Sequence, residues 1–171
     1  MKRMTMALVI ACAMASLPLA AQQSSVKVEL KDLQGAPVGT ATLSPADGGG
    51  VSIALDVKNL PPGEHAFHVH QVARCEPPFA TAGPHFNPDG KKHGLENPAG
   101  AHAGDMSNLT VGADGTAKVT VTNKQVTLGA GASSVLSGGG TSLVIHAKAD
   151  DMKTDPAGNA GDRIACGVIT K

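Results

Sequence analysis

Residues 51–57 read VSIALDV, in which a large apolar side chain stands at every second position. Alternation with a period of two places one row of side chains on each face of a β-strand, so that one face is buried and the other meets water. Residues 26–31 (VKVELK) and 117–122 (AKVTVT) repeat the pattern. Further strands are predicted at 38–44, 65–71, 142–148 and 163–169. The pattern therefore predicts an all-β fold.

Glycine-rich turns separate several of these runs. Asp47-Gly-Gly-Gly and Ala113-Asp-Gly supply positions with positive φ, which hairpin turns require and which glycine adopts without steric cost. Short strands at even spacing are typical of a β-sandwich or a β-barrel. The length of 171 residues predicts a single folded domain.

The segment from Cys75 to Leu109 breaks this rhythm, because it is rich in Pro, Gly and Ala and shows no sustained alternation. An irregular connection of this length is uncommon inside a compact domain unless it has a function. The segment contains His85, His93, His102 and Asp105. We therefore expect bound metal, rather than an apolar core, to hold it in shape.

The start of the chain predicts export. Two positive residues, Lys2 and Arg3, precede an apolar stretch over residues 4–19, and small residues follow it. This order is the pattern of a secretory signal peptide. We predict a signal peptide over residues 1–21 and one mature domain over residues 22–171.

Two other interpretations of this leader are weaker. A membrane-spanning helix needs about 20 apolar residues, and Ser16 and Pro18 interrupt a run that is already short. Residues 9–12 (VIAC) resemble a lipoprotein cleavage box, which would leave a lipidated Cys12, but the apolar stretch before this cysteine is unusually short. We expect export to the periplasm or the cell exterior, with no membrane insertion of the mature chain.

Charge and cysteine content limit the partners and the covalent structure. Loss of residues 1–21 removes two of the 14 basic residues and none of the 14 acidic ones, which leaves 12 against 14 and a net charge of −2. A nucleic-acid partner would favour a basic patch, and we expect none. Cys75 and Cys166 remain, and such a pair in an exported protein predicts one disulfide. It would close a loop of about 90 residues and contribute roughly 4–5 kcal/mol in the chain-entropy model.

Histidines are concentrated on predicted strands as well. Within HAFHVH (65–70), His68 and His70 project from one face of a strand while Val69 points the other way, so both imidazoles can bind a single metal ion. Taken alone, an H-x-H pair is more often polar surface, and a lone strand histidine such as His146 is more often a core residue bonded to backbone. However, the chain has seven histidines, no Trp, no Tyr and three Phe. Histidine is therefore not used here as an ordinary aromatic residue.

The number of candidate ligands favours two metal ions. If both cysteines form a disulfide, nitrogen and oxygen ligands remain, and imidazole-rich sets suit copper and zinc. Three histidines and one aspartate from the irregular segment would make a closed tetrahedral site, typical of structural zinc. His68, His70 and His146 on the strands would make a second site with open coordination positions, as redox chemistry needs.

Six segments of the mature chain form a recognisable set in the same order. They are HAFHVHQ (65–71), AGPHFNP (82–88), KKHG (91–94), HAGD (102–105), VIHAKADD (144–151) and GNAGDRIACGVI (158–169). Together they resemble copper/zinc superoxide dismutase over essentially the whole mature chain, and the leader and the insert at Cys75 resemble the exported bacterial type. The resemblance implies an eight-stranded antiparallel Greek-key β-barrel, an immunoglobulin-like sandwich, with long metal-binding and active-site loops.

The resemblance also implies the ligands, with one copper and one zinc per subunit. The implied copper ligands are His68, His70, His85 and His146. The implied zinc ligands are His85, His93, His102 and Asp105, so that His85 bridges the two ions.

Further roles follow from the same resemblance. Asp150 is implied to accept hydrogen bonds from His68 and His93 and so to fix the orientation of both rings. Arg163 is implied to dock the superoxide anion, with His85 as the second catalytic residue. His65 matches no ligand position, and we expect it to be structural.

The implied activity is dismutation of superoxide to dioxygen and hydrogen peroxide outside the cytoplasm, by a monomer or a homodimer. Steering of the anion by Lys91, Lys92 or Arg74 and ordinary solvated surface charge are equally compatible with the sequence. The alternative function is an exported copper- or zinc-binding or copper-delivery protein without turnover. The chain keeps all the implied ligands and the arginine, which favours catalysis.

Overall fold

The computed structural model describes residues 25–171. The predicted signal peptide and Cys12 lie outside these residues. The described part of the chain contains nine β-strands and two 3-10 helices: β1 (Val26–Asp32), β2 (Pro37–Pro45), β3 (Val51–Val57), β4 (Gly63–His65), β5 (Phe67–His70), η1 (Ala80–Ala82), β6 (Leu109–Val111), β7 (Ala117–Asn123), η2 (Ser137–Gly139), β8 (Thr141–His146) and β9 (Arg163–Ile169). Over residues 25–171, no helix has the length and apolar character that crossing a membrane requires.

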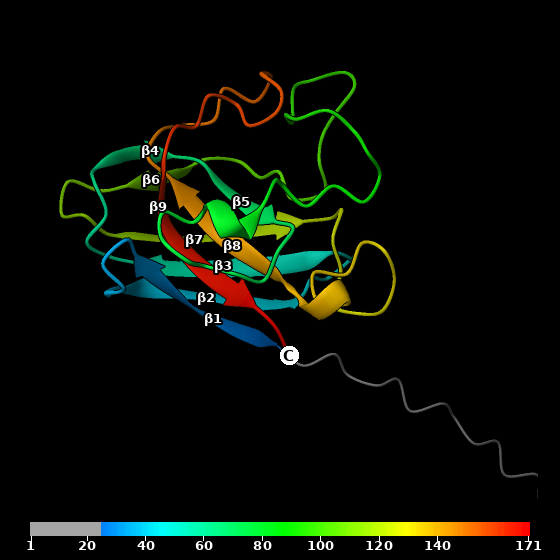
Figure 1. Cartoon of the computed structure of the whole chain (residues 1–171), viewed down its shortest axis with the longest axis horizontal. Coiled ribbons are helices and arrows are strands. Elements are labelled where there is room, and N and C mark those ends of the chain that lie inside the picture. Colours follow the sequence, from blue (N-terminus) through cyan, green and yellow to red (C-terminus); the bar gives the residue numbers. More distant parts are fainter. Residues whose placement is uncertain (1–24) are drawn as a thin grey trace, which may run out of the picture.

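Seven strands form one antiparallel sheet in the order β5-β8-β9-β1-β2-β3-β7, and β4 pairs with β6 in a second, two-stranded sheet. Figure 1 shows the larger sheet curling, with β1, β2 and β3 below β5 and β8. The fold is thus all-β and antiparallel, as predicted.

The predicted strand at 65–71 is divided into β4 and β5 at Ala66. Ala66 is still hydrogen-bonded to the segment at the end of β8. Its N–H donates to the carbonyl of Lys148 at 2.8 Å, and its own carbonyl accepts from the N–H of His146 at 2.8 Å. With β4 and β5 counted as one interrupted strand, the number of strands is the expected eight.

Alternation along β3 decides where the core lies. Val51, Ile53, Leu55 and Val57 are at most 1% exposed, whereas the residues between them are half-buried or exposed. Burial of each such side chain stabilises the fold by about 1.5–3 kcal/mol. The inward rows of the other strands join them in one continuous apolar cluster inside the curled sheet.

Two long loops lie together at one end of the sheet. One joins β5 to β6 (71–108) and the other joins β8 to β9 (147–162), and the second loop and part of the first lie at the top of Figure 1. They are in direct contact, because the N–H of Glu96 donates to the carbonyl of Met152 at 3.0 Å. The first loop also covers the open edge of β5, where Val69 exchanges backbone hydrogen bonds with Phe86 and Gly104 at 2.8–2.9 Å. The candidate ligands are therefore supplied by two strand ends and by a loop fastened to them.

Candidate metal centre

The strand register brings the first three histidines together. His68 and His70 lie on β5, and their partners on β8 are Val144 and Ser142. His146 closes β8, and all three side chains are buried, at most 3% exposed. Val69 belongs to the apolar core, so the two histidines of the H-x-H pair share the opposite face, as predicted.

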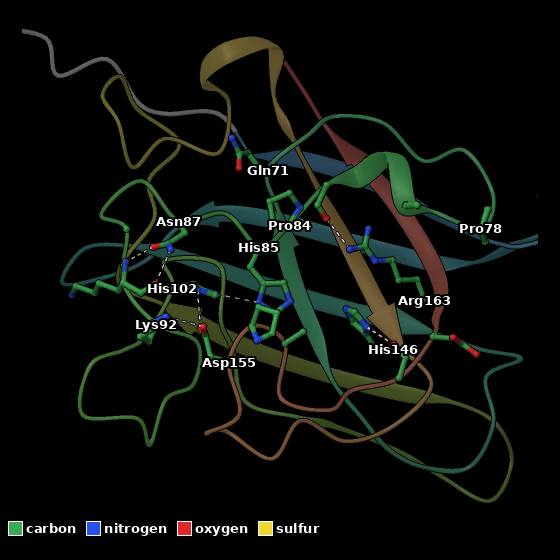
Figure 2. Close-up of a pocket in the computed structure, with 18 of the residues that line it drawn as sticks. Gln71, Pro78, Pro84, His85, Asn87, Lys92, His102, His146, Asp155 and Arg163 are labelled. Atoms are coloured by element: carbon green, nitrogen blue, oxygen red, sulfur yellow. Dashed lines mark hydrogen bonds and ion pairs between the residues drawn. The ribbon is translucent and has the colours of Figure 1, made fainter.

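A fourth histidine completes the first cluster. His68, His70, His85 and His146 each present one ring nitrogen, and these atoms all lie within 4.8 Å of one another. Nε2 of His70 and Nε2 of His146 are 3.3 Å apart. Figure 2 shows His85 in the middle of the site, with His146 on one side and His102 on the other.

The outer nitrogens of this cluster are already anchored. Nδ1 of His70 lies 2.8 Å from the carbonyl oxygen of Gly83, and Nδ1 of His146 lies 3.3 Å from that of Gly161. Each ring therefore presents its remaining nitrogen to the other members of the cluster. Such anchoring fixes the tautomer and orientation of a metal-ligating imidazole.

The second cluster gathers around a single carboxylate oxygen. Oδ1 of Asp105 lies 2.8 Å from Nδ1 of His85, 3.0 Å from Nδ1 of His93 and 3.4 Å from Nδ1 of His102. The other carboxylate oxygen of Asp105 accepts from the N–H groups of Gly94 and His102 at 2.9 and 3.0 Å. Three nitrogens and one oxygen thus face one point, which matches the ligand set of a tetrahedral zinc site.

Buried nitrogens without partners show that these residues fit metal ions. Nδ1 of His68 and Nε2 of His85 are inaccessible to solvent and have no hydrogen-bond partner among the described residues. Leaving such polar atoms unpaired is costly. Both atoms belong to the first cluster, and in the second cluster Nδ1 of His93 is buried beside Oδ1 of Asp105, so the buried donor atoms of both clusters fit metal ions.

Asp150 links the two clusters through the Nε2 atoms of His68 and His93. Its Oδ2 lies 2.8 Å from Nε2 of His68, and its Oδ1 lies 3.0 Å from Nε2 of His93. Gly158 has φ +62° and passes so close to this carboxylate that a Cβ would collide with it. The loop that follows β8 therefore closes directly over the pair formed by Asp150 and His93.

Asn108 holds Asp150 in turn, a contact that sequence analysis missed. Its side-chain amide donates to the carbonyl of Asp150 at 3.0 Å, and its Oδ1 accepts from the N–H of Asp150 at 2.8 Å. These two bonds join positions 42 residues apart. No local pattern in the sequence signals such a contact.

Burial and hydrogen bonding set the charge of the histidines. Burial lowers the pKa of His68 to about 4 and that of His146 to about 3, and it holds the pKa of His70 well below its usual value. Burial also lowers the pKa of His93, but its hydrogen bonds to Asp105 and Asp150 outweigh burial and raise it to about 9. His68, His70 and His146 are thus neutral, which is the form of imidazole that binds metal.

Arg163 lies at the edge of the first cluster. It opens β9 opposite His146, and its Nη1 and Nη2 donate to the carbonyls of Phe79 and Gly83 at 2.6 and 2.8 Å. A disulfide between Cys75 and Cys166, with Cα atoms 5.7 Å apart, ties the loop that carries these carbonyls to β9. The predicted disulfide is therefore present and braces the arginine.

An open cavity of about 1110 Å³ leads to the metal centre, and His85, His102, His146 and Arg163 are among its lining residues. Lys91 also lines it and, among residues 25–171, has no acidic partner within 4 Å. Lys92 pairs with Asp155 at 3.1 Å, and Arg74 pairs with Glu76 at 3.7 Å. Of the three candidate steering residues, Lys91 is the one that presents an uncompensated charge to the cavity.

His65 lies outside both clusters. Its Nδ1 is 2.8 Å from the carbonyl oxygen of His146, and its Nε2 is 2.8 Å from that of Pro61. The ring thus connects the chain before β4 to the last residue of β8, which agrees with the structural role expected from the sequence.

Comparison with known proteins finds relatives over most of the chain. A family model described as Copper/zinc superoxide dismutase (SODC) matches residues 38–169. A Cu-Zn superoxide dismutase of Aquifex aeolicus is 51% identical over 151 residues, which are 86% of this chain and 88% of the relative.

Two solved structures are similar as well. The crystal structure of a SOD-like protein from Bacillus subtilis has a TM-score of 0.81 at 38% identity and covers 84% of this chain and 97% of that one. The structure of Cu/Zn superoxide dismutase from Brucella abortus has a TM-score of 0.70 at 30% identity and covers 85% of this chain and 99% of that one.

Proposed function

The chain belongs to the copper/zinc superoxide dismutase family, and from that premise we propose which of its residues carry the reaction. The protein dismutates superoxide to dioxygen and hydrogen peroxide and uses copper and zinc as cofactors. The overall reaction converts two superoxide anions and two protons into one dioxygen and one hydrogen peroxide, so the protein must supply an electron relay, an anion site and a route for protons.

The two clusters divide the metals between them. We assign copper to His68, His70, His85 and His146, and zinc to His85, His93, His102 and Asp105. Copper, when bound, supplies one-electron redox chemistry, and zinc supplies a fixed positive charge. The four imidazoles of the first cluster suit copper because they are nitrogen ligands, and the single carboxylate of the second suits zinc.

His85 carries the proposal, because its two nitrogens belong to different clusters. Nδ1 is held 2.8 Å from Asp105, whereas Nε2 is buried without a partner and faces the first cluster. The ring lines the open cavity. Nε2 is therefore the atom at which this chain can take up a proton and pass it to reduced superoxide, while Nδ1 keeps the ring in place.

Arg163 provides the anion site. Its guanidinium is half-buried and fastened to two carbonyls at the wall of the cavity, beside His146. A fixed, planar cation with further N–H groups free to donate binds a small anion by charge and by hydrogen bonds. Superoxide held there lies next to the first cluster, whose four histidines would hold the copper that supplies the electron chemistry.

The assignment is tested with His85→Ala and His146→Ala. Copper and zinc content and the rate of superoxide consumption are measured for the wild type and both variants. We expect His146→Ala to lose copper and activity and to keep zinc. We expect His85→Ala to lose activity and to bind both copper and zinc more weakly. A wild type that binds copper tightly without consuming superoxide would instead identify a copper-binding protein.

We infer that the protein is exported. The Cys75–Cys166 disulfide supports this, because stable disulfides are rare in reducing compartments. Cleavage near residue 21, release to the periplasm or the cell exterior, and a homodimer remain predictions. The mass of the protein, measured under denaturing and native conditions after recovery from the periplasmic and the culture fractions, tests all three, and a lipid at Cys12 would appear in the same measurement.

A further inference from the structure

The metal-facing histidines differ in how their outer nitrogens are held. Four of them have an acceptor within hydrogen-bond distance: Asp150 serves His68 and His93, the Gly83 carbonyl serves His70, and the Gly161 carbonyl serves His146. His85 has no outer nitrogen, because both of its nitrogens face the clusters. His102 is the exception, since its Nε2 makes no hydrogen bond within the described part of the chain.

One carboxylate stands beside this nitrogen. Oδ1 of Asp155 lies 3.9 Å from Nε2 of His102, and no other carboxylate oxygen of residues 25–171 comes within 4 Å of it. His102 is 7% exposed, so this side of the ring is close to solvent at the cavity wall. Figure 2 shows Asp155 next to His102 and Lys92.

Asp155 is held in this place by the loop that carries the zinc ligands. Its Oδ1 accepts from the backbone N–H of His93 at 2.7 Å, and its Oδ2 pairs with Nζ of Lys92 at 3.1 Å. Asp155 itself belongs to the other loop, between β8 and β9, and is 62 residues from His93. A single side chain therefore connects the β8–β9 loop to two proposed zinc ligands.

We propose that Asp155 is a positioning residue of the zinc site. A histidine that binds zinc through Nδ1 carries its proton on Nε2, and that proton needs an acceptor. Closure of the gap between Asp155 and His102 by about 1 Å gives a hydrogen bond of ordinary length. Asp155 then does for His102 what Asp150 does for His93, and its bond to the backbone of His93 fastens the β8–β9 loop over the site. The proposal rests on the zinc assignment made above.

Two substitutions separate the parts of this role. Asp155→Ala removes the carboxylate, whereas Asp155→Asn keeps an oxygen that accepts from His93 N–H and loses the charge near His102. Asp151→Asn is the matched control, because Asp151 lies in the same loop and, among residues 25–171, its carboxylate accepts only from Lys153, Thr154 and Asn159 of that loop. His102→Ala tests the zinc assignment itself.

The measurement is release of zinc from the zinc-loaded, copper-free protein into a chelator, together with NMR observation of the His102 Nε2 proton. We expect Asp155→Ala to release zinc at least about tenfold faster than the wild type, Asp155→Asn to be intermediate, and Asp151→Asn to match the wild type. The Nε2 proton should exchange slowly in the wild type and rapidly in Asp155→Ala.

Three results would overturn the proposal. Asp155→Ala could release zinc at the wild-type rate, Asp151→Asn could accelerate zinc release as much as Asp155→Ala does, or the His102 Nε2 proton could exchange at the same rate with and without the Asp155 carboxylate. Each of them leaves the zinc assignment standing if His102→Ala loses zinc. If His102→Ala instead holds zinc as the wild type does, the assignment of the site fails, and the role of Asp155 fails with it.

Discussion

His70 and Arg163 share one acceptor, the carbonyl oxygen of Gly83. Nδ1 of His70 and Nη2 of Arg163 each lie 2.8 Å from it. One peptide group therefore sets the orientation of a proposed copper ligand and the position of the proposed anion site. The spacing between His70 and Arg163 is therefore fixed by the same loop that the disulfide ties to β9.

Arg163→Lys should lower kcat/KM for superoxide by about 10- to 100-fold, because a hydrogen bond to a charged group contributes roughly 1.5–3 kcal/mol and one ammonium cannot span both carbonyls and the substrate. Pulse radiolysis measures this rate directly. Copper content, determined on the same sample, should equal that of the wild type. A variant with full activity would remove Arg163 from the anion site.

Asn108→Ala should weaken metal binding without touching a ligand. The two bonds between Asn108 and Asp150 position the carboxylate that orients His68 and His93, and loss of such outer partners typically lowers metal affinity by 10- to 100-fold. Competition with a chelator gives the affinities for copper and zinc. Thr110→Ala is the control, because Thr110 is exposed on β6 and makes no side-chain hydrogen bond among the described residues. Equal affinities in Asn108→Ala and the control would contradict the role.

Lys91→Gln should slow the reaction by about two- to threefold at low ionic strength, because Lys91 faces the cavity with its charge uncompensated and superoxide is an anion. The difference should fade as salt screens the field. Lys27→Gln makes the same change of charge on β1, away from the residues that line the cavity, and should leave the rate unchanged. An equal effect of both substitutions would mean that net charge, not Lys91, guides the substrate.

The strands could be predicted because their signal is local. Alternation over seven residues marked β3, and the same period placed His68 and His70 on one face. β6 escaped because three residues are too few to show a period. The contacts of Asn108 and Asp155 could not be predicted for another reason. Their partners lie 42 and 62 residues away, and a contact between two irregular loops produces no periodic pattern in the sequence. The two groups of candidate ligands could be proposed from residue types and strand positions, whereas the assignment of His85 to both clusters came only from the resemblance.

The stability of the metal-free protein should depend on pH through the same histidines. The pKa of His68 is about 4 and that of His146 about 3 in the folded protein, against 6.5 for the free side chain. Below pH 6.5 these two histidines bind protons in the unfolded chain but stay neutral in the folded chain. The free energy of unfolding therefore falls as pH drops from 6.5 towards 4. Each histidine contributes at most about 1.4 kcal/mol per pH unit.

His93 acts with the opposite sign, because its pKa is raised to about 9. Its contribution is complete below pH 6.5 and is lost as pH rises through 9, so the metal-free protein should be less stable on both sides of neutrality. Urea unfolding of the metal-free wild type between pH 4.5 and pH 9.5 measures the free energy of unfolding on both the acid and the alkaline side. Below pH 6.5, His68→Gln should reduce the slope of the free energy of unfolding against pH by the equivalent of up to one proton. The slope at alkaline pH should not change. If the free energy of unfolding falls just as steeply with decreasing pH in His68→Gln as in the wild type, the His68 ring does not titrate with unfolding.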